Sequence, residues 1–175
     1  MIRRALPLLA LALAMLTGCA TPPRDTGEAP WISGRLSLRA QATATQAGQS
    51  LSAGFELQGD GQRGELRLHS PLGTRLATAR WAPGLAVLAT AEGESRFQDL
   101  DTLSSQALGE VLPLAALPDW LAGRPWAGAA HQDIEGGFEQ LGWQIVLARR
   151  AEGWIEARRL APPSVWLRVK LDEPA

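Results

Sequence analysis

The sequence lacks the residues on which disulfide and most catalytic chemistry depends. It has one cysteine, Cys19, and two histidines, His69 and His131, in 175 residues. A single cysteine excludes an intramolecular disulfide, and the two histidines are not spaced as a metal-binding pair. The nucleophile-elbow, phosphate-loop and dinucleotide motifs are missing too. We therefore predict a protein that is not an enzyme, with no catalytic residue, no metal and no cofactor.

An excess of basic charge is also missing. The chain has 17 basic and 18 acidic residues. Without Arg3 and Arg4, which fall in a predicted leader, 15 basic and 18 acidic residues remain, a net charge of −3. No basic stripe indicates a nucleic-acid partner. The net charge would not draw the protein onto anionic lipid, so we expect any membrane adhesion to come from apolar groups.

No apolar run is long enough to span a bilayer, which takes about 20 residues. The run from Ala5 to Leu16 follows Arg3 and Arg4 and ends in Leu16-Thr17-Gly18-Cys19. This pattern resembles the bacterial lipobox, whose cysteine is lipidated and becomes the first mature residue. The alternative is an ordinary signal peptide followed by a chance cysteine. We predict a lipoprotein signal peptide over residues 1–18, with lipidation at Cys19.

Residues 19–30 are rich in Pro, Thr and Gly and have no periodicity, which is typical of a flexible tether. Two or more acyl chains on Cys19 would hold the protein stably on a membrane. Ala20 follows Cys19 instead of the Asp that retains enteric lipoproteins in the inner membrane, which favours the outer membrane. Residues 31–175 have no second linker, so we expect one domain there.

Alternating apolar and polar residues predict nine or ten short strands of an antiparallel meander. Gln41–Ser50 is small and polar, and is expected to be a loop. The expected strands cover residues 35–40, 51–58, 64–69, 74–81, 85–91, a segment near Phe97, 138–141, 143–149, 154–160 and 165–172.

The period changes to that of a helix between Asp99 and Pro125. Asp99 or Asp101 is placed to cap a first helix, a role that suits them better than a catalytic carboxylate pair. Pro113 is placed in the first turn of a second helix, which Gly123 and Pro125 would end. Their apolar faces would carry Leu103, Ala107, Leu108 and Val111, and Leu114, Leu117, Trp120 and Leu121. We predict an α+β fold: a curved antiparallel sheet, unclosed, whose concave apolar face is covered by these inserted helices.

The most distinctive stretch is Leu66–Leu76. Pro71 suits the first central position of a type I turn and Gly73 its last position, which puts Leu72 at the tip of a hairpin. Leu72 would either fold back onto the core or point outwards toward a membrane, and both interpretations stay open at this stage.

Seven tryptophans and no tyrosine complete the aromatic set. Most would be core residues. Trp166 is out of phase with Val165, Leu167 and Val169, so we expect it on the outer face, at an interface or a lipid headgroup level, or else packed under a loop.

Taken together, these motifs resemble the LolB family of outer-membrane lipoproteins over nearly the whole mature chain. Two features depart from the family's pattern: aromatic positions often held by Tyr are absent or replaced, and the sequence ends at Ala175 without the aromatic C-terminal residues of many members. The resemblance rests on Leu16–Cys19, Gly34–Leu38, Leu68–Thr74, Ala107–Gly109, Leu112-Pro113, Leu117–Pro125, Gly142–Ile145 and Val165–Val169.

The resemblance implies an unclosed half-barrel with an apolar cavity for acyl chains and an exposed loop, here Pro71, Leu72 and Gly73, that acts on the membrane. It implies a LolA-like periplasmic carrier and acylated lipoprotein cargo as partners, and an outer-membrane, periplasm-facing, lipid-anchored monomer that binds no nucleic acid or cofactor. We expect the cavity to be lined by Phe55, Leu66, Leu68, Leu88, Leu117, Trp120, Ile145 and Leu167.

Two other functions remain open on the residues alone. One is a structural accessory lipoprotein that docks onto an outer-membrane assembly complex through a sheet edge or a tryptophan patch. The other is a small-ligand-binding sheet domain at the cell surface.

Overall fold

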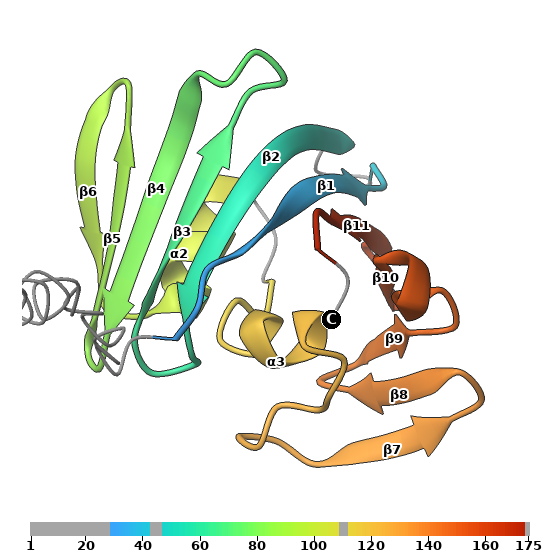
Figure 1. The fold of residues 1–175 in the computed structure, drawn as a ribbon. Coiled ribbons are helices and arrows are strands. Elements are labelled where there is room, and N and C mark those ends of the chain that lie inside the picture. Colours follow the sequence, from blue (N-terminus) through green and yellow to red (C-terminus); the bar gives the residue numbers. More distant parts are fainter. Residues whose placement is uncertain (1–28, 43–46, 109–111, 174–175) are drawn as a thin grey trace, which may run out of the picture.

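A single antiparallel sheet of eleven strands dominates the computed structural model, which describes residues 29–42, 47–108 and 112–173 (Figure 1). The strand order is β6-β5-β4-β3-β2-β1-β11-β10-β9-β8-β7, so the sheet is unclosed, as predicted. The strands are β1 (Ile32–Ala40), β2 (Gln49–Gly59), β3 (Gly64–His69), β4 (Arg75–Ala82), β5 (Leu85–Thr90), β6 (Gly93–Phe97), β7 (His131–Ile134), β8 (Gly137–Gln140), β9 (Trp143–Val146), β10 (Trp154–Arg159) and β11 (Val165–Leu171).

Two meanders make up this sheet, and its first and last strands join them. β1 pairs with β11 from Gly34 opposite Leu171 to Ala40 opposite Val165. Gly34 permits this approach, because a Cβ there would collide with the carbonyl oxygen of Lys170.

The core lies on the face of the sheet that the alternation predicts. Leu38, Phe55, Leu57 and Leu66 are buried on adjacent strands, while the residues between them are more exposed. This alternation is what a sheet with one solvated face requires. In the second meander the buried face continues through Phe138, Trp143, Ile145, Ile155, Ala157, Val165 and Val169.

The strand prediction missed β7. Its four residues, His131–Ile134, are exposed or half-buried at the edge of the sheet, so no apolar alternation marks them. Gln49 and Ser50, expected in a loop, begin β2.

The first helix, α2 (Leu100–Leu108), begins where it was expected. The carboxylate of Asp99 accepts a hydrogen bond of 2.7 Å from the Thr102 backbone N–H, which is an N-cap. This hydrogen bond lowers the pKa of Asp99. The helix contacts β5 and β6.

The second helix, α3 (Leu117–Leu121), begins later than predicted. Residues 114–116 form a turn, and Pro118, not Pro113, lies in the first turn of the helix. A helix that began at Pro113 would carry Pro118 in its interior, where proline cannot donate to the residue four back. Gly123, with φ of +76°, follows the end of the helix as predicted. The helix contacts β2, and a 3-10 turn, η2 (Arg150–Glu152), precedes β10.

Gln140 ties α3 and the segment after it to strand β8. Its side-chain oxygen accepts hydrogen bonds from the Trp120 indole N–H (2.8 Å) and the Trp126 backbone N–H (2.9 Å). Its amide nitrogen donates to the carbonyls of Trp126 (2.7 Å) and Ala129 (2.8 Å). Gln140 is 2% exposed, and these bonds use both of its donors and both acceptor positions of its oxygen.

Gln140→Leu is therefore expected to lower the free energy of unfolding by about 2–4 kcal/mol, because it leaves the buried Trp120 indole N–H without its partner. Urea denaturation followed by tryptophan fluorescence measures this. Gln132→Leu, at an exposed position on β7, is the matched control and should change stability by less than about 0.5 kcal/mol. Equal losses in the two variants would contradict the role given to Gln140.

Candidate functional site

The connection between β3 and β4 is a tight turn held by hydrogen bonds. The Ser70 carbonyl accepts from the Gly73 N–H (2.9 Å), and the Ser70 N–H donates to the Thr74 carbonyl (2.7 Å). The Ser70 hydroxyl oxygen also accepts from the Leu72 and Thr74 N–H groups, at 3.3 and 3.2 Å. Gly73 has φ of +83°. This pattern fits a type I turn followed by a left-handed residue, with Pro71 and Gly73 where the sequence put them.

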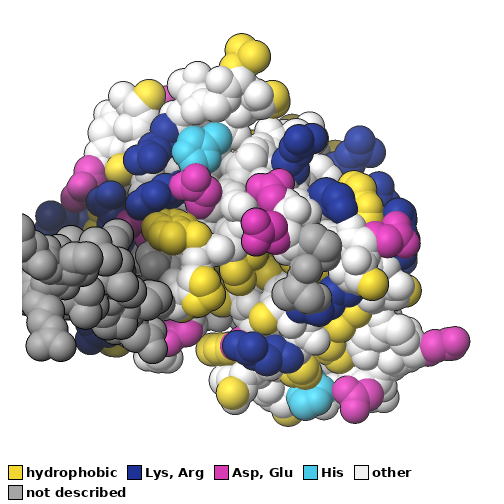
Figure 2. All heavy atoms as spheres, viewed as in Figure 1, with side chains coloured by type: hydrophobic (Ala, Val, Ile, Leu, Met, Phe, Trp, Pro, Cys, Tyr) yellow, Lys and Arg dark blue, Asp and Glu magenta, His cyan; other side chains and the backbone are white. Residues whose placement is uncertain are grey.

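Leu72 stands at the tip of this turn and is 94% exposed. Hydrophobic atoms protrude there beyond the surrounding surface, over the β3–β4 connection at the top of Figure 2. Pro71 to Leu76 are all exposed. Burying a leucine side chain contributes about 1.5–3 kcal/mol to stability. Leu72 does not gain this free energy within its own fold. The sequence left two positions open for Leu72, folded back onto the core or pointing outwards. In the structure Leu72 points outwards.

A small hollow lies on the inner, apolar face of β3, the face that carries Leu66 and Leu68. Its volume is about 60 Å³, and only leucine, tryptophan and proline side chains line it. The strands contribute Leu36, Leu38, Leu51, Leu66, Leu68, Trp143 and Leu167, and the helical region contributes Leu112, Pro113, Leu114, Leu117 and Trp120.

The residues expected to line a cavity divide into two groups. Leu66, Leu68, Leu117, Trp120 and Leu167 lie around this hollow. Phe55 and Ile145 are instead in the packed core, 2% and 0% exposed, and Leu88 packs against that core. Sequence reasoning did not include Leu36, Leu38 and Leu51, although their alternation signalled the same face. It also left out Leu112, Pro113, Leu114 and Trp143.

The hollow is small in this structure. A volume of 60 Å³ equals about two water molecules' share of liquid, whereas pockets that enclose small ligands measure about 300–1,000 Å³. Any large apolar ligand therefore requires one wall to move.

The wall formed by residues 112–117 is joined to the helices on either side of it. The Leu112 N–H donates to the Ser104 hydroxyl of α2 (2.9 Å). Further bonds run from Leu114 N to Leu112 O, from Ala116 N to Pro113 O and from Trp120 N to Ala116 O. Toward the strands, this wall presents the apolar side chains that line the hollow.

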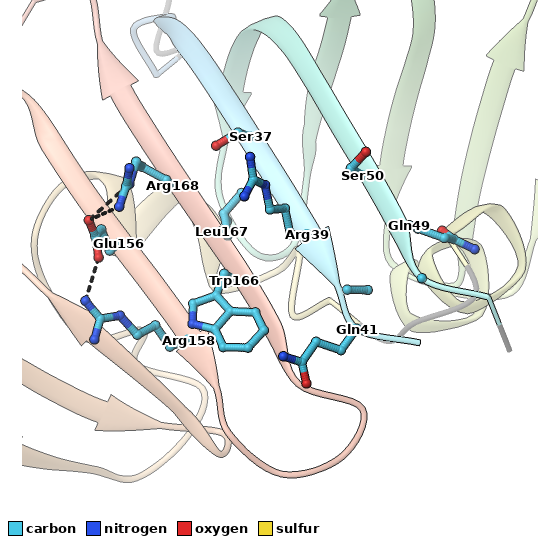
Figure 3. A pocket seen from close by; sticks show the side chains of 12 residues that line it. Ser37, Arg39, Gln41, Gln49, Ser50, Glu156, Arg158, Trp166, Leu167 and Arg168 are labelled. Carbon is cyan, nitrogen blue, oxygen red and sulfur yellow. Dashed lines mark hydrogen bonds and ion pairs between the residues drawn. The ribbon is translucent and has the colours of Figure 1, made fainter. Parts of the chain in front are cut away.

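A second cavity, of about 670 Å³, opens on the outer face of β1, β2, β10 and β11 (Figure 3). Eight of its twelve lining residues are polar or charged, among them Arg39, Arg158, Arg168 and Glu156 around Trp166. Glu156 pairs with Arg158 (2.7 Å) and Arg168 (3.1 Å), and these partners lower its pKa, the Arg158 hydrogen bond most strongly. Trp166 thus lies on the outer face. Guanidinium groups are poor neighbours for an acyl chain, so this cavity does not serve as an apolar pocket.

Other kinds of site do not emerge from the described ranges. Within residues 29–42, 47–108 and 112–173, no group of three or more His, Cys, Asp or Glu side chains could hold a metal ion. The same ranges hold no helix with both the length and the apolar character that crossing a bilayer takes. Cys19, the predicted lipidation site, lies outside the described residues.

Comparison with known proteins places these features in context. Residues 31–171 match the family model described as "Outer membrane lipoprotein LolB". The chain is similar to proteins named "Outer-membrane lipoprotein LolB" from Bordetella petrii (32% identity, 92% of this chain and 88% of the relative) and Bordetella pertussis (37%, 81% and 76%). It is similar also to the protein of that name from Chromobacterium violaceum (35%, 87% and 86%).

The turn geometry makes a prediction about Gly73. Gly73→Ala should lower the free energy of unfolding by about 1–2 kcal/mol, because an L-residue is strained at φ of +83° although no atom lies within 4 Å of the new Cβ. Gly54→Ala on β2 is the control, since its Cβ would meet only ordinary contacts at 3.9 Å and its backbone is not left-handed. That variant should gain about 0.5–1 kcal/mol. Thermal unfolding of both variants checks the difference, and a loss confined to Gly54→Ala would contradict the turn assignment.

Proposed function

The chain belongs to the LolB family of outer-membrane lipoproteins, and we propose that it accepts acylated lipoproteins from a LolA-like periplasmic carrier into an apolar cavity and inserts them into the inner leaflet of the outer membrane. The observation that carries this proposal is the continuity of β3. Leu66 and Leu68 line the hollow, and the same strand leads directly into the turn that exposes Leu72. One short segment thus links a place for lipid tails to a tip that can enter a bilayer.

The helical region is proposed as the cover of the sheet's concave apolar face. Contacts of α2 with β5 and β6, and of α3 with β2, support this arrangement (Figure 1). In our proposal residues 112–117 move outward to admit cargo, while Gln140 keeps α3 on β8.

The free energies favour such an exchange. Moving the wall would expose Leu112, Leu114 and Leu117, at a cost of about 1.5–3 kcal/mol each. An acyl chain of about 16 carbons gains about 0.8 kcal/mol per methylene removed from water, or about 12 kcal/mol. Measured against water, the burial of an acyl chain therefore exceeds the cost of opening, and in this proposal the empty protein closes over its own leucines.

Transfer in this scheme needs no nucleotide. The acyl chains pass from carrier to this protein and then to the bilayer down a gradient of increasing affinity. Lipid on Cys19 would hold the domain at the target membrane and raise its effective concentration there. The role proposed for the domain is therefore transport and not catalysis.

Leu72 acts at the last step in this proposal. Its burial in lipid contributes only about 1.5–3 kcal/mol, too little to anchor the protein but enough to bias its orientation and disturb the leaflet where cargo leaves.

Leu72→Glu is expected to leave folding and acceptance of cargo intact and to reduce incorporation of cargo into membranes at least tenfold, because a carboxylate at the tip resists entry into lipid. Reconstituted transfer from the loaded carrier to vesicles separates the two steps. Leu160→Glu, at another exposed leucine (59%), is the matched control and should incorporate cargo normally. Loss of acceptance together with incorporation in Leu72→Glu would refute the proposed division of steps.

A change within the hollow tests the cavity itself. Leu68→Trp should fill space that an acyl chain needs and weaken the binding of a fluorescent fatty acid at least about tenfold. Leu85→Trp, at an exposed leucine on β5, should leave binding unchanged. Displacement of the probe by an acylated peptide establishes that the site takes lipid. Saturable binding that is equal in both variants would place the lipid elsewhere.

A further inference from the structure

Strand register places an ordered row of side chains across the outer face of the sheet. In the ladder, Ser50 on β2 pairs with Arg39 on β1, Arg39 pairs with Trp166 on β11, and Trp166 pairs with Arg158 on β10. Directly paired residues share a face of the sheet. Figure 3 shows Arg39, Trp166 and Arg158 side by side on this surface. We term these three residues the arginine row.

The arginine row carries uncompensated positive charge. Glu156 in the next row pairs with both Arg158 and Arg168. Arg39 has no ion pair among the residues that the structure describes. When Arg168 of that next row is included, three arginines against one carboxylate leave a local charge of +2 around the Trp166 indole, although the mature chain as a whole is acidic.

The arginine row also lies at the same end of the sheet as Leu72. The last pair between β2 and β3 is Gly54 with His69, and the Leu72 turn follows His69 directly. Ser50 lies four residues beyond Gly54 in that direction, about 13 Å at about 3.3 Å per residue. Leu72 lies three residues past His69, so it extends no further along the strand direction than Ser50 does. By register, the arginine row on β1, β10 and β11 and the Leu72 turn therefore lie toward the same end of the sheet.

We infer that the arginine row is a membrane-docking surface, on which Arg39 and Arg158 bind lipid phosphates of an anionic bilayer while Trp166 lies at headgroup depth. Guanidinium groups form paired hydrogen bonds with phosphate, and tryptophan concentrates at the headgroup level of membranes. With only one exposed leucine in the membrane, the domain could tilt freely about that contact. A second contact on the neighbouring face fixes the orientation of the domain relative to the membrane. This inference rests on the proposed function, since it supplies the orientation in which Leu72 meets the membrane.

The test uses the mature chain, residues 19–175, with Cys19→Ala, which removes the predicted leader, the acyl attachment and the only thiol. Cosedimentation with vesicles of phosphatidylcholine containing 30% phosphatidylglycerol measures affinity. Arg39→Gln with Arg158→Gln should weaken binding at least about tenfold, since each arginine near an anionic surface contributes about fivefold. Arg39→Lys with Arg158→Lys retains the charge and should bind within about threefold of the parent.

Arg63→Gln with Arg96→Gln is the matched control. Arg63 is exposed in the β2–β3 connection, at the opposite end of β3 from the Leu72 turn, and Arg96 pairs with Glu94 at the far edge of the sheet. The control removes the same charge and should weaken binding less than about twofold. Equal weakening in both glutamine pairs would overturn the inference, because only net charge would then matter.

A reporter at Ser50→Cys, labelled with a polarity-sensitive fluorophore, tests the location directly. We expect a blue shift with the anionic vesicles and no shift for the same label at Ser95→Cys on β6. Equal binding to pure phosphatidylcholine, or a shift caused by an acidic peptide but not by vesicles, would overturn membrane docking. If Leu72→Glu alone weakens vesicle binding while the arginine variants do not, the proposed function stands and this inference fails.

Discussion

The structure depends on the contact between the leucine-rich face of the sheet and the helical segment laid against it. Side chains from β1, β2, β3 and β11 meet Leu112, Leu114, Leu117 and Trp120 around a hollow that holds no polar side chain. Hydrophobic contact of this kind is non-directional. Other apolar groups can therefore replace the segment, and an acyl chain of cargo lipoprotein is such a group. The most specific contact of the helical region, between Trp120 and Gln140, lies at its far end and need not break.

A rigid part, the β3–β4 turn, and a replaceable part, the wall of residues 112–117, thus lie close to one another. The β3–β4 turn is held by four hydrogen bonds around Ser70, so Leu72 is presented at a fixed place whether or not the hollow is filled. The wall opposite β3 is held toward the strands by apolar side chains, which suits it to yield. On the outer face, Arg39, Trp166 and Arg158 are proposed as a second point of contact with a bilayer. In the proposed function, these three features together let the domain hold lipid on one face and meet a membrane at one end.

Much of the fold could be predicted from alternation alone, because a one-sided antiparallel sheet imposes a period of two on every central strand. The edge strand β7 escaped, since an exposed edge imposes no such period. The start of α3 was misplaced because two prolines, Pro113 and Pro118, compete for the first turn, and only the second leaves the helix interior free of proline.

The site was partly predictable for the same reasons. The turn residues Pro71 and Gly73 signalled the tip, and the apolar phase placed Leu66 and Leu68 on the inner face. Phase does not distinguish a residue beside a hollow from one in the packed core, which is why Phe55 and Ile145 were grouped with them. Net charge likewise could not reveal the arginine row, because its members come from three strands and are brought together only by register.

The central claim is that acyl chains lodge between the inner face of the sheet and residues 112–117. The most direct measurement uses a cargo lipoprotein with a photoreactive group on its acyl chain, irradiated during transfer from the carrier, with the adducts mapped by mass spectrometry. The account predicts adducts on Leu36, Leu51 and Leu68 and on the 112–117 segment. Adducts confined to the outer face or to the Leu72 turn would contradict it.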